Sequence, residues 1–144
     1  MAAIKPVTPA EAAELMKQGS IYVDVRSEAE FEQGHPAGAL NVPLLKNAPG
    51  GMAPNADFLT DMQAAFGTAE PLIVGCKAGG RSRRAAEMLV RAGFADVSDQ
   101  VAGFDAGRDP FGKPLPGWSR ANLPVEAGQP AGQSYPDVKA RKPR

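Results

Sequence analysis

Short aliphatic runs with little polar alternation recur along the chain, separated by stretches in which apolar residues have helical spacing. The runs are IYVDV (21–25), ALNVP (39–43), PLIVG (71–75) and ADVSDQV (95–101). Val, Ile and Leu are enriched in strands, and we predict a strand in each run. Because these strands lack an alternating polar face, we expect them in a sheet that is buried on both sides.

Helices are predicted between the strands. Thr8, Pro9 and Glu11 form a capped helix start, in which Thr8 and Glu11 make a capping box, and Gly19 ends this helix. Further helices are expected over 27–34, from a cap at Asn55 to about residue 66, and over 82–92.

The helix over 82–92 is amphipathic. Its inward face is predicted to carry four apolar residues, Ala85, Met88, Leu89 and Ala92. Its outward face is predicted to carry two charge pairs at i,i+4 spacing, Arg83–Glu87 and Glu87–Arg91.

Alternating strands and helices predict an α/β domain with a mainly parallel sheet between helices. We assign this domain to residues 1–126. The Gly- and Pro-rich segments 46–55 and 104–117 are predicted to be loops. The Pro- and Gly-rich segment 127–144, with a net charge of +3, is predicted to be a mobile, solvated tail.

Composition narrows the possible functions. The formal net charge of the 144-residue chain is zero, which argues against a nucleic-acid or membrane-surface role. No apolar run approaches the roughly 20 residues of a membrane span, and the start of the chain lacks the apolar core of a secretory signal, so the cytoplasm is expected. With one cysteine, Cys76, and one histidine, His35, we expect no disulfide, no metal site and no cofactor.

The single cysteine lies in the sequence VGCKAGGRS (74–82), where the strand over 71–75 gives way to a helix. Ligands bind beyond the carboxyl ends of parallel strands. The small residues after Cys76 allow successive N–H groups to point into one concavity, which, with the helix dipole, binds anions and stabilises a thiolate. A free thiol has a pKa near about 8.5, and such surroundings lower it, so Cys76 is a candidate nucleophile.

A buried structural cysteine is the ordinary alternative. The loop argues against it, because a core cysteine does not require two glycines and a cation nearby. Arg81 lies where a helix dipole disfavours a cation, which makes sense if an anion occupies the loop. Arg83 and Arg84 are instead assigned to the solvated face of the helix.

These residues resemble the rhodanese (sulfurtransferase) family in its single-domain form. VDVRSEAEFEQGHPAGALNVP (23–43) is similar to the family's D-x-R, E-[FY] and G-H-x-x-G-A-x-N-x-P signature, and CKAGGRS (76–82) is similar to its active-site loop. Weaker likenesses lie in VSDQVAGF (97–104) and in Trp118 with NLPV (122–125). The resemblance covers roughly residues 6–126. It implies a rhodanese-like three-layer α/β domain with a five-stranded, mainly parallel sheet between helices.

The resemblance implies a reaction. Cys76 would attack a sulfur donor such as thiosulfate and keep the sulfur as a persulfide, and cyanide, a cellular thiol or a sulfur-accepting protein would then remove it. The donor would bind to the loop, through Lys77, Ala78, Gly79, Gly80, Arg81 and Ser82. A non-catalytic binding or sulfur-carrier module, and a phosphatase or arsenate reductase of the same fold, remain as alternatives.

Loop length and charge bear on the substrate. The loop from Cys76 to Arg81 has six residues. The phosphatases and arsenate reductases that share the fold of the resembled family have a loop one residue longer, and the shorter loop suits sulfur. Lys77 and Arg81 argue against mercaptopyruvate, whose enzymes have an uncharged loop. Ala78 stands where two-domain thiosulfate enzymes carry a basic residue, so another persulfide is an alternative donor.

Polar residues of the first signature complete the candidate site. Asp24 and Arg26 follow a strand on its carboxyl side and border the expected pocket. We favour a structural salt bridge between them over a direct role in catalysis. His35 is interpreted as a hydrogen-bonding structural residue, and Glu30 as part of a helix surface.

Overall fold

The computed structural model describes residues 2–109 and 111–143. Its centre is a five-stranded parallel sheet with the strand order β1-β8-β7-β2-β4. These strands are β1 (Ile4–Val7), β2 (Ile21–Asp24), β4 (Leu40–Asn41), β7 (Leu72–Gly75) and β8 (Val97–Gln100). The predicted fold class is confirmed. The sequence patterns located four of these strands, each within one or two residues at most boundaries, and missed β1.

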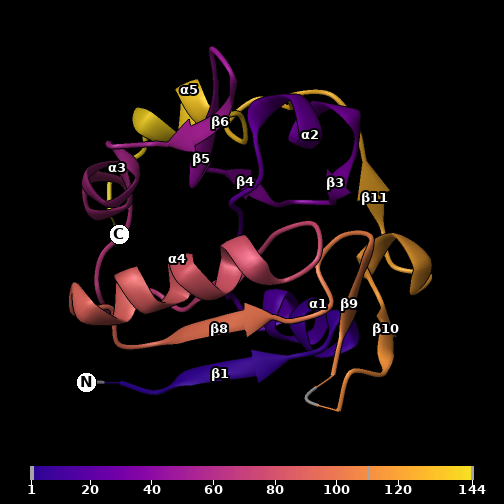
Figure 1. The fold of residues 1–144 in the computed structure, drawn as a ribbon. Coiled ribbons are helices and arrows are strands. Elements are labelled where there is room, and N and C mark those ends of the chain that lie inside the picture. The colour runs from indigo at the N-terminus through magenta and orange to yellow at the C-terminus, as the bar shows by residue number, and fades with distance from the viewer. Residues whose placement is uncertain (1, 110, 144) are drawn as a thin grey trace.

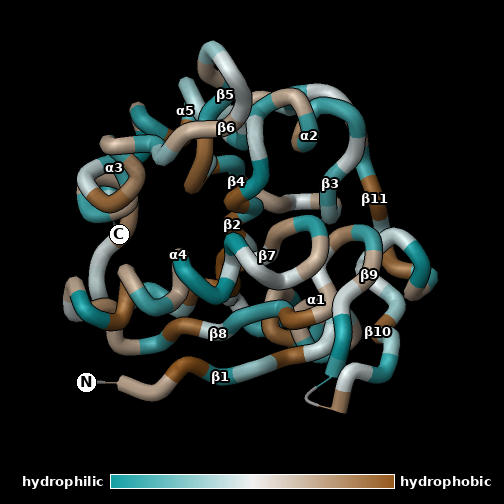
Figure 2. The backbone as a smooth tube through the Cα atoms, viewed as in Figure 1, coloured by the Kyte–Doolittle hydropathy of each residue, from teal (hydrophilic) through white to brown (hydrophobic). Residues whose placement is uncertain are grey.

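Helices cover both faces of the sheet (Figure 1). They are α1 (Pro9–Lys17), α2 (Glu28–Gln33), α3 (Phe58–Ala65), α4 (Gly80–Arg91) and α5 (Tyr135–Lys139), with a 3-10 turn, η1 (Trp118–Arg120). One apolar cluster joins α3, α4 and α5 to the sheet, and the other joins α1, Phe31 of α2 and Trp118 of η1 to the opposite face. Hydrophobic residues (brown) recur along the strands of the sheet (Figure 2).

Helix starts follow the capping rules closely. Thr8 and Glu11 form the predicted capping box of α1, and Ser27 with Glu30 forms a second one at α2. The expected cap of α3 is wrong, because Asp57 rather than Asn55 precedes that helix. The Asn55 side-chain amide instead donates to the carbonyl of Pro43 and to the hydroxyl of Tyr135.

Helix α4 departs from its prediction in two ways. It begins at Gly80 rather than at Ser82, so Arg81 lies in its first turn. Met88 is not part of the inward face, because it is 37% exposed while Ala86 and Val90 are buried. The predicted Arg83–Glu87 pair is present, with Nε and Oε1 3.7 Å apart.

Both segments that were predicted as loops contain antiparallel hairpins. Residues 46–55 contribute to β5 (Leu45–Ala48) and β6 (Gly51–Pro54). Residues 104–117 contain β9 (Ala106–Arg108) and β10 (Pro114–Pro116). Gly and Pro marked the turns and edges of these hairpins, and we interpreted them as signs of a segment without strands. A further short pair joins β3 (His35–Pro36) to β11 (Val125–Glu126).

Part of the C-terminal segment packs on the domain, at odds with the mobile tail that we expected. Tyr135 and Val138 of α5 are buried in the core, and Asn41 of the edge strand β4 donates its N–H to the carbonyl of Gln133. Arg141 reaches Glu70 with an N–O distance of 2.9 Å. Buried apolar side chains and polar contacts thus both attach this segment to the domain. Among the other predicted tail cations, Arg144 lies outside the described residues.

Helices long and apolar enough to cross a membrane are absent from the part of the chain that the structure describes.

Candidate active site

Cys76 lies at the carboxyl edge of the sheet, directly after β7 and between the ends of β2 and β8. It is 2% exposed, and three residues separate it from the start of α4. The preceding Gly75 leaves room for a neighbour, because a Cβ there would lie 1.9 Å from the Tyr22 hydroxyl oxygen. The strand and the helix therefore place the thiol where the sequence predicted it.

The loop after Cys76 curls back toward the sulfur. Gly79 has a φ of +106° and donates its N–H to the Cys76 Sγ at 3.0 Å. A Cβ at Gly79 would lie 2.9 Å from the carbonyl oxygen of Val101. Backbone conformation and crowding thus both favour glycine at position 79. The Gly79 N–H points at the sulfur, as a loop that stabilises an anion requires. Ala78 and Gly80 are exposed on the same loop.

Ser82 connects the thiol to a buried carboxylate that we did not predict. The Cys76 Sγ lies 3.5 Å from the Ser82 Oγ, and this hydroxyl donates to Asp99 Oδ1 at 2.7 Å. Asp99 ends up 3% exposed near the carboxyl end of β8, where burial raises the pKa of its carboxyl. A charged residue inside the apolar pattern over 95–101 was the signal that could have revealed it.

Arg81 forms a bidentate ion pair with Glu30. Its NH1 and NH2 groups donate to the two carboxylate oxygens at 2.6 and 3.0 Å. Burial alone would raise the pKa of Glu30, but the hydrogen bonds from Arg81 and from Ser27 outweigh it and lower that pKa to about 2. The assignment of Glu30 to a helix surface is therefore wrong, because it holds the first turn of α4 against α2.

The predicted role of Arg81 in donor binding is compatible with this pair. A guanidinium has five N–H donors, and Glu30 takes two of them. An anion in the loop would find a cation whose charge is already partly neutralised. Lys77 is exposed and lies 3.8 Å from the Asp105 carboxylate, so it is the less constrained of the two loop cations.

The segment after β8 is attached to the cysteine loop through its backbone. Phe104 and Asp105 donate their N–H groups to the carbonyls of Cys76 and Lys77, at 2.7 and 3.1 Å. A Cβ at Gly103, which has a φ of +69°, would lie 2.3 Å from the Lys77 carbonyl oxygen. The hairpin β9–β10 that follows is therefore fixed next to the loop.

Asp24 and Arg26 form the structural salt bridge that we favoured. The pair is buried, with Arg26 NH2 2.7 Å from Asp24 Oδ2, and the same nitrogen donates to the Gly34 carbonyl at 2.6 Å. The guanidinium lies 4.4 Å from the centre of the Phe104 ring. Arg26 also lines a cavity of about 160 Å³ beside Lys77, whereas Asp24 is not among the residues that line it.

His35 is a structural residue, as expected. Its Nδ1 lies 2.7 Å from the Phe31 carbonyl oxygen, its Nε2 lies 3.1 Å from Glu126, and its ring stacks on Phe31. No group of three or more His, Cys, Asp or Glu side chains that could hold a metal ion occurs within residues 2–109 and 111–143.

Comparison with known proteins identifies a family for this chain. The family model described as "Rhodanese-like domain" matches residues 8–109. Thiosulfate sulfurtransferase 16, chloroplastic, of Arabidopsis thaliana is 40% identical over 116 residues, which are 81% of this chain and 88% of that protein. Thiosulfate sulfurtransferase GlpE of Haemophilus influenzae is 34% identical over 122 residues, 85% of this chain and 94% of the relative.

A solved structure also resembles this chain in its fold. The crystal structure of Rv0390 from M. tuberculosis superposes with a TM-score of 0.72 at 28% identity, over 89% of this chain and 100% of the other. The class of protein is therefore an α/β domain with a cysteine-containing loop at the carboxyl edge of its parallel sheet. The chain belongs to the rhodanese-like domain family, and the family resemblance of its two main motifs is confirmed.

Proposed function

We propose that this protein moves sulfane sulfur from thiosulfate, or from a related persulfide donor, to a thiophilic acceptor through a persulfide on Cys76. The protein is a rhodanese-type sulfurtransferase, in line with the relatives named thiosulfate sulfurtransferase that match it over most of their length. The observation that carries the mechanism is the Gly79 N–H donated to the Cys76 Sγ at the start of α4.

The reaction has two displacement steps. The Cys76 thiolate attacks the outer sulfur of thiosulfate, the S–S bond of the donor breaks, and sulfite leaves with that electron pair. An acceptor thiolate or cyanide then attacks the outer sulfur of the persulfide, and Cys76 leaves as a thiolate. The Gly79 N–H and the dipole of α4 stabilise negative charge on the sulfur in both steps.

The charges around the loop favour an anionic donor. Lys77 is exposed at the rim, and Arg81 keeps three N–H donors beyond those that Glu30 accepts. Ala78 adds no third cation to the loop, so a persulfide donor stays the alternative to thiosulfate. We also propose a sulfur-accepting protein as a partner and the cytoplasm as the location.

Steady-state kinetics test the proposal. We expect the purified protein to make thiocyanate from thiosulfate and cyanide with parallel double-reciprocal lines, the pattern of a covalent intermediate. Cys76→Ser removes the nucleophile and should abolish this turnover. Comparable turnover by Cys76→Ser would favour a binding module, and turnover of an aryl phosphate or of arsenate would favour the oxyanion enzymes of the same fold.

A further inference from the structure

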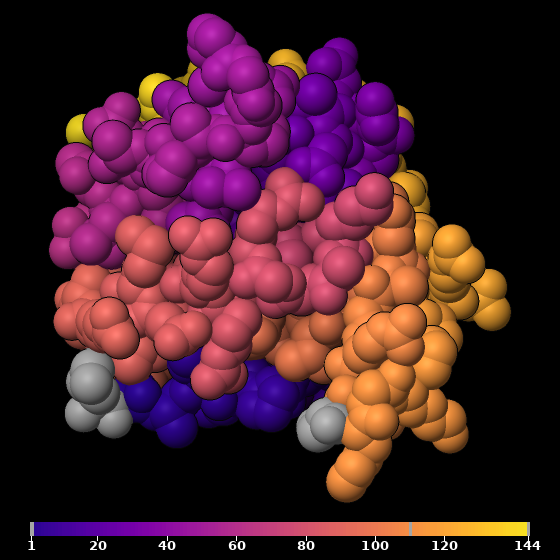
Figure 3. All heavy atoms as spheres, in the orientation of Figure 1, coloured from indigo at the N-terminus to yellow at the C-terminus, as the bar shows by residue number. Residues whose placement is uncertain are grey.

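A second hollow lies on the other side of the cysteine loop. It has a volume of about 550 Å³ and is bounded by the loop, the start of α4, the end of β8 and the hairpin β9–β10. Ala78 and Gly79 contribute the loop wall, and Cys76 is not among the lining residues. In Figure 3 the loop and the start of α4 (pink) lie directly beside the hairpin (orange) on one face of the molecule.

A buried carboxylate lines this hollow. Asp99 is 3% exposed, and its side chain accepts one hydrogen bond, from Ser82, with no ion pair within 4 Å among the described residues. Burial of a carboxylate is costly, and it raises the pKa of Asp99 even though the hydrogen bond from Ser82 and the charge of Arg83 act in the opposite direction. The hollow therefore offers a place for a ligand ammonium group.

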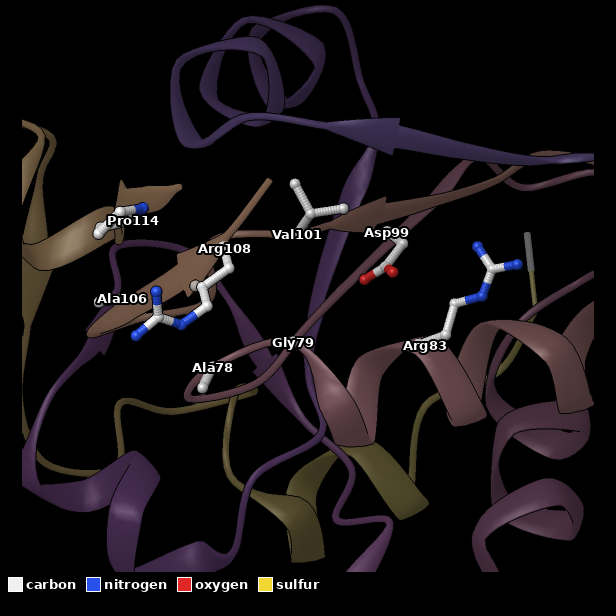
Figure 4. Close-up of a pocket in the computed structure, with 9 residues that line it drawn as sticks. Ala78, Gly79, Arg83, Asp99, Val101, Ala106, Arg108 and Pro114 are labelled. Carbon is white, nitrogen blue, oxygen red and sulfur yellow. The ribbon is translucent and has the colours of Figure 1, made fainter. Parts of the chain in front are cut away.

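Two arginines stand at its edges (Figure 4). Arg108 rises from β9 on the side of Ala78, and Arg83 stands on α4 at the other end, beside Asp99. Arg83 has only a loose contact with Glu87 at 3.7 Å, and Arg108 donates to the Gly112 carbonyl without a carboxylate partner within the described residues. Both guanidinium groups are therefore able to bind a carboxylate.

We propose that this hollow binds the α-amino acid end of a small thiol that accepts the sulfur. The ligand ammonium would pair with Asp99, and its carboxylate with Arg108, which unlike Arg83 does not lie beside Asp99. This assignment rests on the proposed sulfurtransferase function. The site adjoins the reacting sulfur, because Gly79 both lines the hollow and donates to Cys76 Sγ, and Ser82 joins Asp99 to the same sulfur.

The transfer to such a thiol is a simple displacement. The acceptor thiolate bonds to the outer sulfur of the Cys76 persulfide, the bond from that sulfur to Cys76 Sγ breaks, and Sγ keeps the electron pair. The products are a free amino-acid persulfide and the Cys76 thiolate, with no net oxidation or reduction. The hollow is large enough for an amino acid or a short peptide, in line with pockets for small ligands.

Three matched thiols test the assignment. L-cysteine carries both charged groups, cysteamine lacks the carboxylate, and 3-mercaptopropionate lacks the ammonium. In Arg108→Gln we expect the kcat/KM ratio of L-cysteine to cysteamine to fall about tenfold, the size expected for a lost charge-assisted hydrogen bond. In Asp99→Asn the ratio of L-cysteine to 3-mercaptopropionate should fall by a similar factor.

The comparison has internal controls. Each thiol is compared with itself across variants, so differences in thiol pKa and in overall turnover cancel from the ratios. Arg84→Gln removes an exposed cation from α4 that does not line the hollow, and its ratios should match the parent. Ratios that stay unchanged in Arg108→Gln and Asp99→Asn, or sulfur transfer to a protein thiol only, would overturn the assignment.

A binding experiment distinguishes a failure of the amino-acid site from a failure of the proposed sulfurtransferase function. S-methyl-L-cysteine cannot accept sulfur, yet it should shift the amide NMR signals of Gly79 and Gly107, which line the hollow, more than 3-(methylthio)propanoate does. These shifts are expected even if thiosulfate never transfers sulfur to Cys76. A missing transfer would refute only the proposed function, not the binding site. Equal shifts from both probes, or none, would refute the amino-acid site itself.

Discussion

The ion pair between Arg81 and Glu30 should couple the active-site loop to helix α2 in a pH-dependent way. Glu30→Gln keeps the shape of the side chain and the N-terminal turn of α2 but removes the negative charge opposite the guanidinium. Two N–O contacts of 2.6 and 3.0 Å join Arg81, in the first turn of α4, to α2. Its loss should therefore destabilise the protein.

The magnitude follows from the pKa of Glu30. This pKa lies at about 2 in the folded protein, against an ordinary value of 4.5. At about 1.4 kcal/mol for each pH unit, the depression corresponds to at most about 3 kcal/mol. Because the two side chains are 19% and 28% exposed, solvent screening reduces our expectation to about 1–2 kcal/mol.

The sign of the pH dependence is fixed by the direction of that pKa. A carboxyl with a depressed folded-state pKa stabilises the protein above its unfolded-state value near pH 4.5. This stabilisation is lost as the pH falls toward about 2. The gap in unfolding free energy between the parent and Glu30→Gln should therefore be full at neutral pH and shrink to less than half near about pH 3.

Urea unfolding of Glu30→Gln, Arg81→Gln and the double variant measures the coupling directly. We expect a coupling free energy of about 1–2 kcal/mol at neutral pH. Glu28→Gln, an exposed acidic residue in the first turn of the same helix, is the control and should show no coupling with Arg81. A coupling near zero, or one that does not decrease in acid, would refute the reasoning.

Three further substitutions test other parts of the structure. Gly79→Ala strains a backbone at φ +106° and crowds the Val101 carbonyl, so we expect about 1–3 kcal/mol lower stability in urea and a large loss of thiocyanate formation. Arg26→Met leaves Asp24 as a buried unpaired charge and should cost about 3–5 kcal/mol in the same urea assay. Val138→Ala removes a buried methyl pair from α5 and should lower stability by about 1–2 kcal/mol; no change would mean that the tail is not docked.

The parts of the fold that depend on local pattern could be predicted from the sequence. The aliphatic runs at 21–25 and 71–75 identified strands, because a sheet buried on both faces needs residues of this kind at every position. Strand β1 (IKPV) escaped notice because Lys5 and Pro6 interrupt its short apolar pattern. Those residues are tolerated there because β1 is an edge strand with Pro6 near its end.

The candidate site also has one part that could be predicted from local sequence and one part that could not. The cysteine, its glycines and the first turn of the next helix are contiguous, so their arrangement followed from the chain itself. Glu30 and Asp99 lie 51 and 17 residues from the partners that they bind, and only the packing of α2 and β8 around the loop brings them together. Contacts between distant polar side chains leave no periodic signal, which is why both were missed.

The intact mass of the protein after incubation with thiosulfate tests the central claim most directly. The account predicts that the parent gains the mass of one sulfur atom, that peptide mapping places it on Cys76, and that cyanide removes it. Cys76→Ser should gain nothing. A parent that acquires no sulfur from thiosulfate or from any persulfide donor would contradict the account.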